Sequence, residues 1–152
     1  MIQRIQSIWL LLASLTISCL LFLYLVSSTV GNTTYYMLAS GLYQQVGAET
    51  KQVEAYLPLL ISVIAVAAMC FVNIFNFRKR TAQKRITFSA IVLIIGLSFW
   101  CNAYAKKIPG GLETANYHMG MFLPIIAVIF CGLAIKGINN DEKLLKSADR
   151  LR

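Results

Sequence analysis

The chain has 152 residues, of which 58% are hydrophobic and only 13% are charged. Soluble globular domains average roughly 45–50% apolar and about 25% charged residues, so this composition excludes an ordinary soluble domain and indicates a protein embedded in a membrane. The formal net charge of +8 does not indicate a nucleic-acid partner, because the basic residues lie in short segments between apolar runs and form no soluble basic face.

Four apolar runs are each long enough, at about 20 residues, to cross a bilayer as a helix. They cover residues 7–29, 55–77, 86–105 and 119–138, which leaves room for a single domain over residues 1–152. The first run exceeds the apolar region of about 7–15 residues that a signal peptide carries, so we interpret it as a retained helix. Pro58 suits the first turn of the second helix, whereas Pro124 predicts a kink in the fourth.

The basic residues between these runs predict the orientation of the chain. Eleven of the fourteen Lys and Arg residues belong to the N-terminus, to residues 78–85, or to the end of the fourth run and the tail; Lys51, Lys106 and Lys107 lie in the other two connections. Positively charged segments stay in the cytoplasm. The sequence therefore predicts an all-α membrane protein, a four-transmembrane-helix bundle with its N and C termini cytoplasmic.

The first outer connection, residues 30–54, is too long for a simple link and is rich in Tyr, Thr and Gln. Residues 33–38 and 42–46 are strand-like, and Ala39-Ser40-Gly41 between them can form a turn. We therefore predict a short β-hairpin that caps the bundle. An isolated hairpin is only marginally stable and needs support from the bundle.

Polar and aromatic residues gather on the outer side, where residues 106–118 contain a Pro-Gly-Gly turn and the single histidine of the chain. We group six of these residues as the outer patch: Tyr35, Tyr36, Asn102, Glu113, Tyr117 and His118. The patch has two interpretations. It forms a pocket for a small molecule or lipid, or it is the wet rim where amphipathic rings ordinarily sit at a membrane interface, and the second is favoured.

Two basic segments on the cytoplasmic side are candidates for contacts with lipid or with a partner protein. Residues 78–85 form a basic turn that can bind anionic headgroups at about 1 kcal/mol per charge, although its role in setting topology already explains it. Residues 139–152 form an amphipathic tail, in which Asn139 or Asn140 caps a short helix lying on the membrane surface or on a partner. The candidate contact residues are Arg78, Lys79, Arg80, Lys84, Arg85, Lys143, Lys146, Arg150 and Arg152.

The apolar runs lack the groups that usually mark catalysis or transport. Lys136 is the single Asp, Glu, His, Lys or Arg residue within them, and it lies about one turn from the cytoplasmic end, where its long side chain snorkels. Small residues such as Ala127, Cys131 and Ala134 suit close helix packing. The four cysteines show no metal-site spacing, and no phosphate loop or nucleophile elbow is present. We therefore predict no catalytic residue, no cofactor and no metal.

The two ends of the chain carry a family resemblance. Residues 1–13, MIQRIQSIWLLLA, and residues 141–152, DEKLLKSADRLR, together with the four apolar runs, resemble the uncharacterised family catalogued as domain of unknown function 4293, small membrane proteins of Bacteroidota bacteria. The resemblance extends over essentially the whole chain. It implies a location in the bacterial inner membrane and brings no activity, cofactor or site residue with it.

Three hypotheses follow for function. The favoured one is a non-catalytic accessory or scaffold protein of the bacterial inner membrane, whose cytoplasmic ends engage anionic lipid, another membrane protein or a cytoplasmic protein. The alternative is a small-molecule or lipid-binding membrane protein that uses the outer patch. A thiol-redox membrane enzyme is the least favoured, because buried thiols are generally inert.

Overall fold

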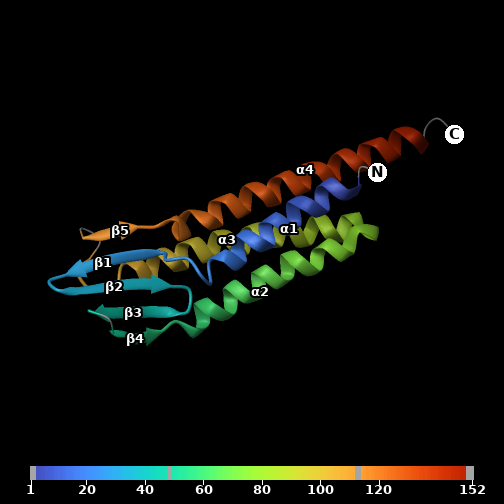
Figure 1. Ribbon diagram of the computed structural model, residues 1–152. Helices are drawn as coiled ribbons and strands as arrows, with labels where there is room; N and C mark the ends of the chain where they lie inside the picture. The colour runs from blue at the N-terminus through green and yellow to red at the C-terminus, as the bar shows by residue number, and fades with distance from the viewer. Residues whose placement is uncertain (1–2, 48, 112–113, 150–152) are drawn as a thin grey trace.

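The chain folds into a helical bundle with a β-sheet at one end (Figure 1). The computed structural model describes residues 3–47, 49–111 and 114–149. In chain order the elements are α1 (Gln3–Cys19), β1 (Val26–Val30), β2 (Thr33–Leu38), β3 (Gly41–Val46), β4 (Glu49–Ala55), α2 (Leu57–Asn73), the 3₁₀ helix η1 (Ile74–Arg78), α3 (Arg80–Ala105), β5 (Ala115–Tyr117), the 3₁₀ helix η2 (Met119–Phe122) and α4 (Leu123–Asp149).

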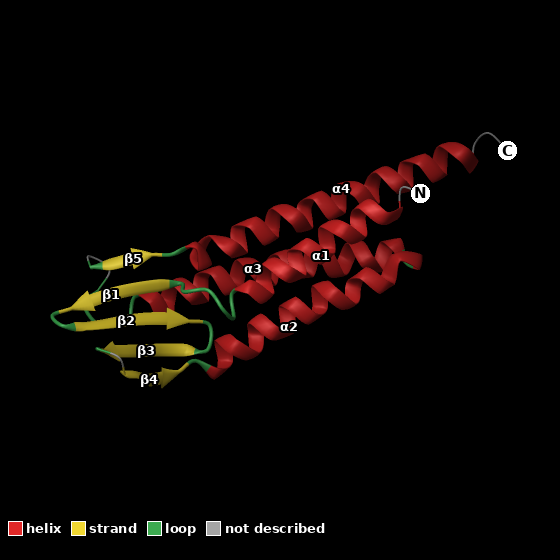
Figure 2. Cartoon of the chain, viewed as in Figure 1, coloured by secondary structure: helices red, strands yellow, loops and turns green. Residues whose placement is uncertain are grey.

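The prediction of an all-α fold is wrong, because five strands form an antiparallel sheet in the order β4-β3-β2-β1-β5. The predicted hairpin is present: β2 and β3 pair in register from Thr33 opposite Val46 to Leu38 opposite Gly41. It forms the centre of a larger sheet, which supplies the support that an isolated hairpin lacks. Figure 2 shows this sheet extending from one end of the helices.

The strands that the sequence did not predict come from three different segments. β1 is the end of the first apolar run, where the sequence Val-Ser-Ser-Thr-Val is rich in β-branched residues. β4 is a polar, exposed edge strand, and the short β5 comes from the second outer connection and pairs with β1. Gly31, at φ +61°, allows the tight turn between β1 and β2.

The first helix is shorter than the predicted span of residues 7–29. α1 ends at Cys19, residues 20–23 form hydrogen-bonded turns, and β1 begins at Val26. The difference has a simple physical reason. A helix that crosses lipid and a strand buried in a core are both apolar, so hydropathy cannot mark the point where one gives way to the other.

Three helical segments among the described residues are long and apolar enough to cross a membrane: Leu57–Phe77, Arg80–Ala105 and Met119–Lys143. Pro58 lies in the first turn of α2, as predicted. Pro124 lies at the start of α4, because residues 119–122 form η2, so this proline begins the helix and does not kink it. α4 then continues to Asp149, and Asn139 and Asn140 lie inside it instead of capping a separate helix.

The four helices lie side by side and alternate in direction, so both chain termini lie at the end opposite the sheet (Figure 1). α4 packs most extensively on α1, and Ala127, Cys131 and Ala134 of α4 are completely buried. Ser14 of α1 donates a hydrogen bond to the backbone carbonyl of Ala67 of α2 at 3.0 Å. Small and hydroxyl-bearing residues thus bring the helices close together, as in bundles that pack within lipid.

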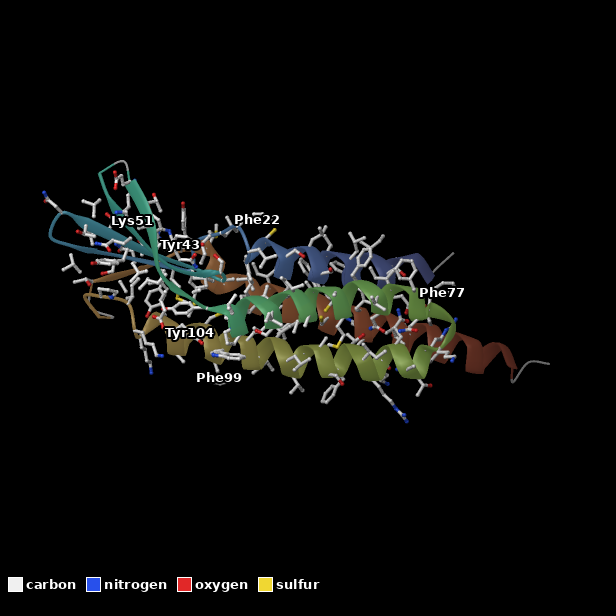
Figure 3. All side chains as sticks on the ribbon, turned by 90° about the horizontal axis from the view of Figure 1, so that it is seen from below. Phe22, Tyr43, Lys51, Phe77, Phe99 and Tyr104 are labelled. Carbon is white, nitrogen blue, oxygen red and sulfur yellow. The ribbon has the colours of Figure 1, made fainter. Side chains whose placement is uncertain are left out.

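The outer surface of the bundle carries large apolar side chains that are not buried in the core. Phe99 is 74% exposed, and Ile61 and Phe88 are each 63% exposed. In Figure 3 Phe22 and Phe99 project away from the ribbon. Such a large exposed apolar surface is rare on soluble monomers. It fits a bundle whose sides face lipid.

Candidate functional site

The structure brings only part of the outer patch together. Tyr36 and His118 are linked through two neighbours: the Ser27 hydroxyl lies 2.8 Å from Nε2 of His118, and the Tyr24 ring lies 5.2 Å from the ring of Tyr36 and 6.2 Å from that of His118. Ser27 and Tyr36 are also opposite each other on β1 and β2. Tyr24 and Ser27, which the sequence analysis did not single out, therefore belong to this group.

The remaining members of the outer patch lie elsewhere. Tyr35 adjoins Tyr36 on β2 and so points to the opposite face of the sheet. Tyr117 is exposed on β5, opposite Val26. Asn102 lies on α3 in a separate groove of about 340 Å³ between α3 and α4, and Glu113 lies outside the described residues. Tyr35, Tyr117 and Asn102 thus lie at separate places in the described structure, outside the group around Tyr36 and His118.

One face of the sheet carries a row of neutral polar side chains across all five strands. Neighbouring strands place these residues opposite one another: Asn116, Ser27, Tyr36, Tyr43 and Gln52. Tyr36 donates a hydrogen bond to Oε1 of Gln45, and the hydroxyls of Ser40 and Tyr43 lie 3.1 Å apart. The aromatic rings are therefore held in place by local hydrogen bonds on a half-buried surface.

Tyr56 connects the sheet to the bundle. It is 2% exposed, stacks on Tyr104 with ring centroids 4.1 Å apart, and donates its backbone N–H to the carbonyl of Ser40 at 3.0 Å. Burial, and then the charge of Glu54, raise the pKa of Tyr56 to about 12. The phenol therefore stays neutral, and its role here is packing.

The opposite end of the bundle contains a buried polar cluster that joins α2 to α3. The side-chain amide of Asn73 donates to the carbonyl of Gln83 at 3.1 Å and to the hydroxyl of Thr87 at 2.9 Å. Gln83 returns a hydrogen bond from its side-chain amide to the carbonyl of Asn73 at 3.3 Å. All three residues are 0–1% exposed. This reciprocal pairing fixes the turn between the two helices from the inside.

The N-terminal and C-terminal motifs of the chain meet at the same end. Gln6 of α1 is 1% exposed and packs against Gly137 of α4, where an added Cβ would lie 3.5 Å from Cβ of Gln6. Asp141, one turn further along α4, is 5% exposed. Three buried polar atoms here have no hydrogen-bond partner within the described structure: Nε2 and Oε1 of Gln6 and Oδ2 of Asp141. A buried polar atom normally binds a partner or an ordered water, so we expect water here.

The basic turn lies beside this cluster and is held to α4. Nζ of Lys84 donates to Oδ1 of Asn139 at 2.6 Å, and Nη1 of Arg80 donates to the carbonyl of Asp141 at 3.4 Å. Lys79 and Arg85 are exposed. The structure therefore places Arg80 and Lys84 against the C-terminal part of α4, with Lys79 and Arg85 exposed beside them.

The other candidate contact residues are described less completely. Lys143 is exposed on α4. Arg78 ends η1 and Lys146 lies on the last turns of α4, and only their backbone is described. Arg150 and Arg152 lie outside the described residues.

The cysteines belong to the packed core, with one exception. Cys70, Cys101 and Cys131 are buried free thiols, and Cys19 is an exposed one at the end of α1. Cys70 on α2 and Cys131 on α4 both belong to the buried apolar core. Within the described ranges no group of three or more His, Cys, Asp or Glu residues is placed to hold a metal ion.

Asn73 and Asn76 lie three residues apart near the end of the second apolar run, a spacing that predicts a polar contact between helices, and Asn73 makes such a contact. Sequence reasoning missed its partner Gln83, which lies among basic residues and looks like an ordinary interfacial side chain. The buried positions of α3 run Gln83, Thr87, Ala90, Ile94 and Leu97, at spacings of three and four. Extending the helical period of the apolar residues back into the basic turn would have placed Gln83 on the inner face.

A family model agrees with the resemblance of the chain ends. The model described as Domain of unknown function (DUF4293) matches residues 2–151. No curated protein matches the chain. Because the match extends over almost the entire sequence, the chain belongs to the DUF4293 family.

Proposed function

We propose that the chain is a non-catalytic accessory or scaffold protein of a bacterial inner membrane, with both termini in the cytoplasm and the sheet outside. One observation carries the proposal: the termini and the basic turn lie at one end of the bundle, and the sheet, with Lys51, lies at the other (Figures 1 and 3). Among the described residues, nine of the twelve Lys and Arg residues belong to the segments at the end with the termini, and Lys51, Lys106 and Lys107 belong to those at the sheet end. The positive-inside rule then favours this orientation.

The short helix α1 is compatible with four crossings. It has 17 residues, which rise about 25 Å, and the apolar turn that follows it contains Phe22, which is 79% exposed. α1 also packs along α2 and α4, two of the three helices long enough to span. A helix held along spanning neighbours lies in the same bilayer, and residues 20–23 bring the chain to its outer boundary.

The cytoplasmic end is the surface on which we place the partner contact. The beginning of α1 and the last part of α4 meet there, with Gln6 against Gly137 and the basic turn attached to Asn139. Glu142 and Lys143 continue α4 beyond this contact, and Lys143 is exposed. A helix end of this kind, ordered by its neighbours, presents side chains to a partner without the entropy loss of folding on binding.

Orientation is tested by labelling introduced cysteines in a Cys19→Ser background, which removes the exposed native thiol. A membrane-impermeant maleimide added to intact, outer-membrane-permeabilised cells should label Lys51→Cys and should reach Lys143→Cys only after lysis. The reverse pattern would overturn the proposed topology.

The partner contact is tested by exchanging charges without changing the net charge. The double variant Glu142→Lys with Lys143→Glu should reduce the yield of a cross-linked partner at least tenfold in living cells. The matched control exchanges Glu49 and Lys51, an exposed pair 3.8 Å apart on the sheet, and should leave the yield unchanged. Equal cross-linking yields from both exchanges would show that the partner does not bind at the cytoplasmic end.

A second candidate function is ligand binding on the outer sheet face, and the convergence of Tyr24, Ser27, Tyr36 and His118 favours it. The face offers aromatic rings, hydroxyls and amides without formal charge, which suits a neutral polar ligand. Replacement of Tyr36 by Ala should abolish such binding. Unchanged retention of a ligand by this variant in native mass spectrometry would exclude the face.

A further inference from the structure

Two adjoining hollows lie on the surface of α3 at the basic end. One, of about 540 Å³, lies between α3 and α4 and is lined by Thr81, Lys84, Arg85, Phe88, Ser89 and Ile135. The other, of about 630 Å³, is lined by Lys79, Arg80, Thr81, Ala82, Arg85 and Ile86. Thr81 and Arg85 line both, so the two hollows adjoin at these side chains, and we refer to them together as the groove.

The chemistry of the groove changes along the helix axis. Cationic and hydroxyl-bearing side chains line the part near the start of α3, and Phe88 and Ile135 line the part further into the bundle. From Thr81 to Ser89 the helix rises about 12 Å. A charged region thus passes into an apolar one over the distance that separates a phospholipid headgroup from the upper part of its acyl chains.

The cations of the groove are partly positioned before any ligand arrives. Lys84 is held by Asn139 of α4 at 2.6 Å, which keeps its ammonium beside the groove. Arg85 is exposed, and no hydrogen bond of its guanidinium is found within the described structure, so its planar donors are available. A guanidinium binds two phosphate oxygens at once. No Asp or Glu side chain lines either hollow.

We propose that this groove binds one anionic phospholipid of the cytoplasmic leaflet. Arg85 and Lys84 hold its phosphate, the Thr81 hydroxyl lines the same end of the groove, and an acyl chain lies over Phe88 and Ile135. The inference rests on the proposed orientation, which places the start of α3 at the cytoplasmic interface. Charge complementarity and the adjoining apolar wall together favour a phospholipid over a soluble anion, which would gain nothing from Phe88.

The test measures binding of phosphatidylglycerol to the purified full chain in neutral-lipid nanodiscs, by native mass spectrometry after titration. Replacing both Lys84 and Arg85 by Gln should weaken binding by at least tenfold, since each interfacial charge contributes about 1 kcal/mol. The matched control, Lys51→Gln with Lys106→Gln, removes two exposed cations from the sheet end and should bind like the unaltered chain. Equal losses in both variants would show diffuse attraction and overturn the groove.

Two further arms identify the ligand and guard against misfolding. Arg85→Gln alone leaves the Lys84–Asn139 contact intact and should still weaken binding several-fold. Inorganic phosphate at millimolar concentration should fail to displace the lipid, and Phe88→Ser should weaken lipid binding; full displacement by phosphate with no effect of Phe88→Ser would assign the site to a free anion. Both leaflets of a nanodisc are accessible, so these binding experiments do not depend on the orientation of the chain in the cell. A failure of the lipid site is therefore distinguished from a wrong topology, which the cysteine labelling tests.

Discussion

The two ends of the molecule satisfy their polar groups in different ways. At the sheet end most hydrogen bonds are made by the backbone, because five strands pair their N–H and C=O groups. Neutral hydroxyls and amides lie on one face of this sheet. At the basic end side chains make the hydrogen bonds between helices, in the Asn73–Gln83–Thr87 cluster and in the contacts of Lys84 and Arg80 with α4. The comparison teaches that stability at the sheet end rests on strand pairing and aromatic packing, whereas at the basic end it rests on a few buried amides.

The largest effect that separates the two ends should come from Tyr56→Ala. Truncating a fully buried aromatic residue costs about 3–5 kcal/mol, and Tyr56 also stacks on Tyr104 at the junction of sheet and bundle. Denaturant unfolding in detergent should show this loss, and hydrogen exchange should accelerate in β3 and β4 before it changes at the start of α3. The control Tyr24→Ala removes a ring that is 48% exposed and should cost far less. A uniform rise in exchange would mean that the two ends unfold as one unit.

Alkaline pH should weaken the same junction. The pKa of Tyr56 is raised to about 12, above the value of about 10 for a free phenol. The phenol therefore contributes its full stability below pH 10 and loses it as the pH rises toward 12, by about 2 kcal/mol. Unfolding measured between pH 9 and 12 should show this loss, and Tyr56→Phe should remove the part of it that belongs to Tyr56. An identical pH dependence in the two chains would contradict the assignment.

A smaller effect, confined to the basic end, is expected from Asn73→Ala. The variant removes the two hydrogen bonds that the Asn73 amide donates to the Gln83 carbonyl and the Thr87 hydroxyl, and a hydrogen bond contributes about 0.5–1.5 kcal/mol. Hydrogen exchange should rise around the turn between α2 and α3 while the sheet keeps its protection. Asn102→Ala, at an exposed position of α3, is the matched control and should be nearly neutral. Loss of protection in the sheet would show that the amide cluster supports the whole molecule.

The smallest effect should come from the ion pair of Lys51 with Glu49. Both side chains are about 80% exposed and the atoms lie 3.8 Å apart, and exposed pairs contribute at most about 1 kcal/mol and often nothing measurable. Neutralising both by Gln should leave the unfolding free energy unchanged and insensitive to salt. A clear loss of stability would mean that charge, and not strand pairing, holds β4 in the sheet.

Sequence reasoning succeeded where a periodic pattern was available. The apolar runs predicted four helices, and strand-like residues on either side of a Gly-containing turn predicted the pairing of β2 with β3. It failed at β1, whose valines extend an apolar run, and at β5, whose three residues form a strand only because the fold brings them beside Val26. Sequence reasoning placed Tyr36 and His118 in the outer patch, but their link through Ser27 and Tyr24 follows from the register of β1 and β2, which the sequence did not give.

The pairing of β5 with β1 also sets an order of events during synthesis. The first four strands are complete once the chain has been made as far as Ala55, but β5 begins at Ala115, after α3 has been made and has run its full length. The fifth strand can therefore pair with β1 only after α3 has brought the chain back to the end of the bundle where the first four strands lie. In the orientation proposed above, a chain whose second or third helix fails to cross the membrane would therefore leave β1 as an open edge of the sheet.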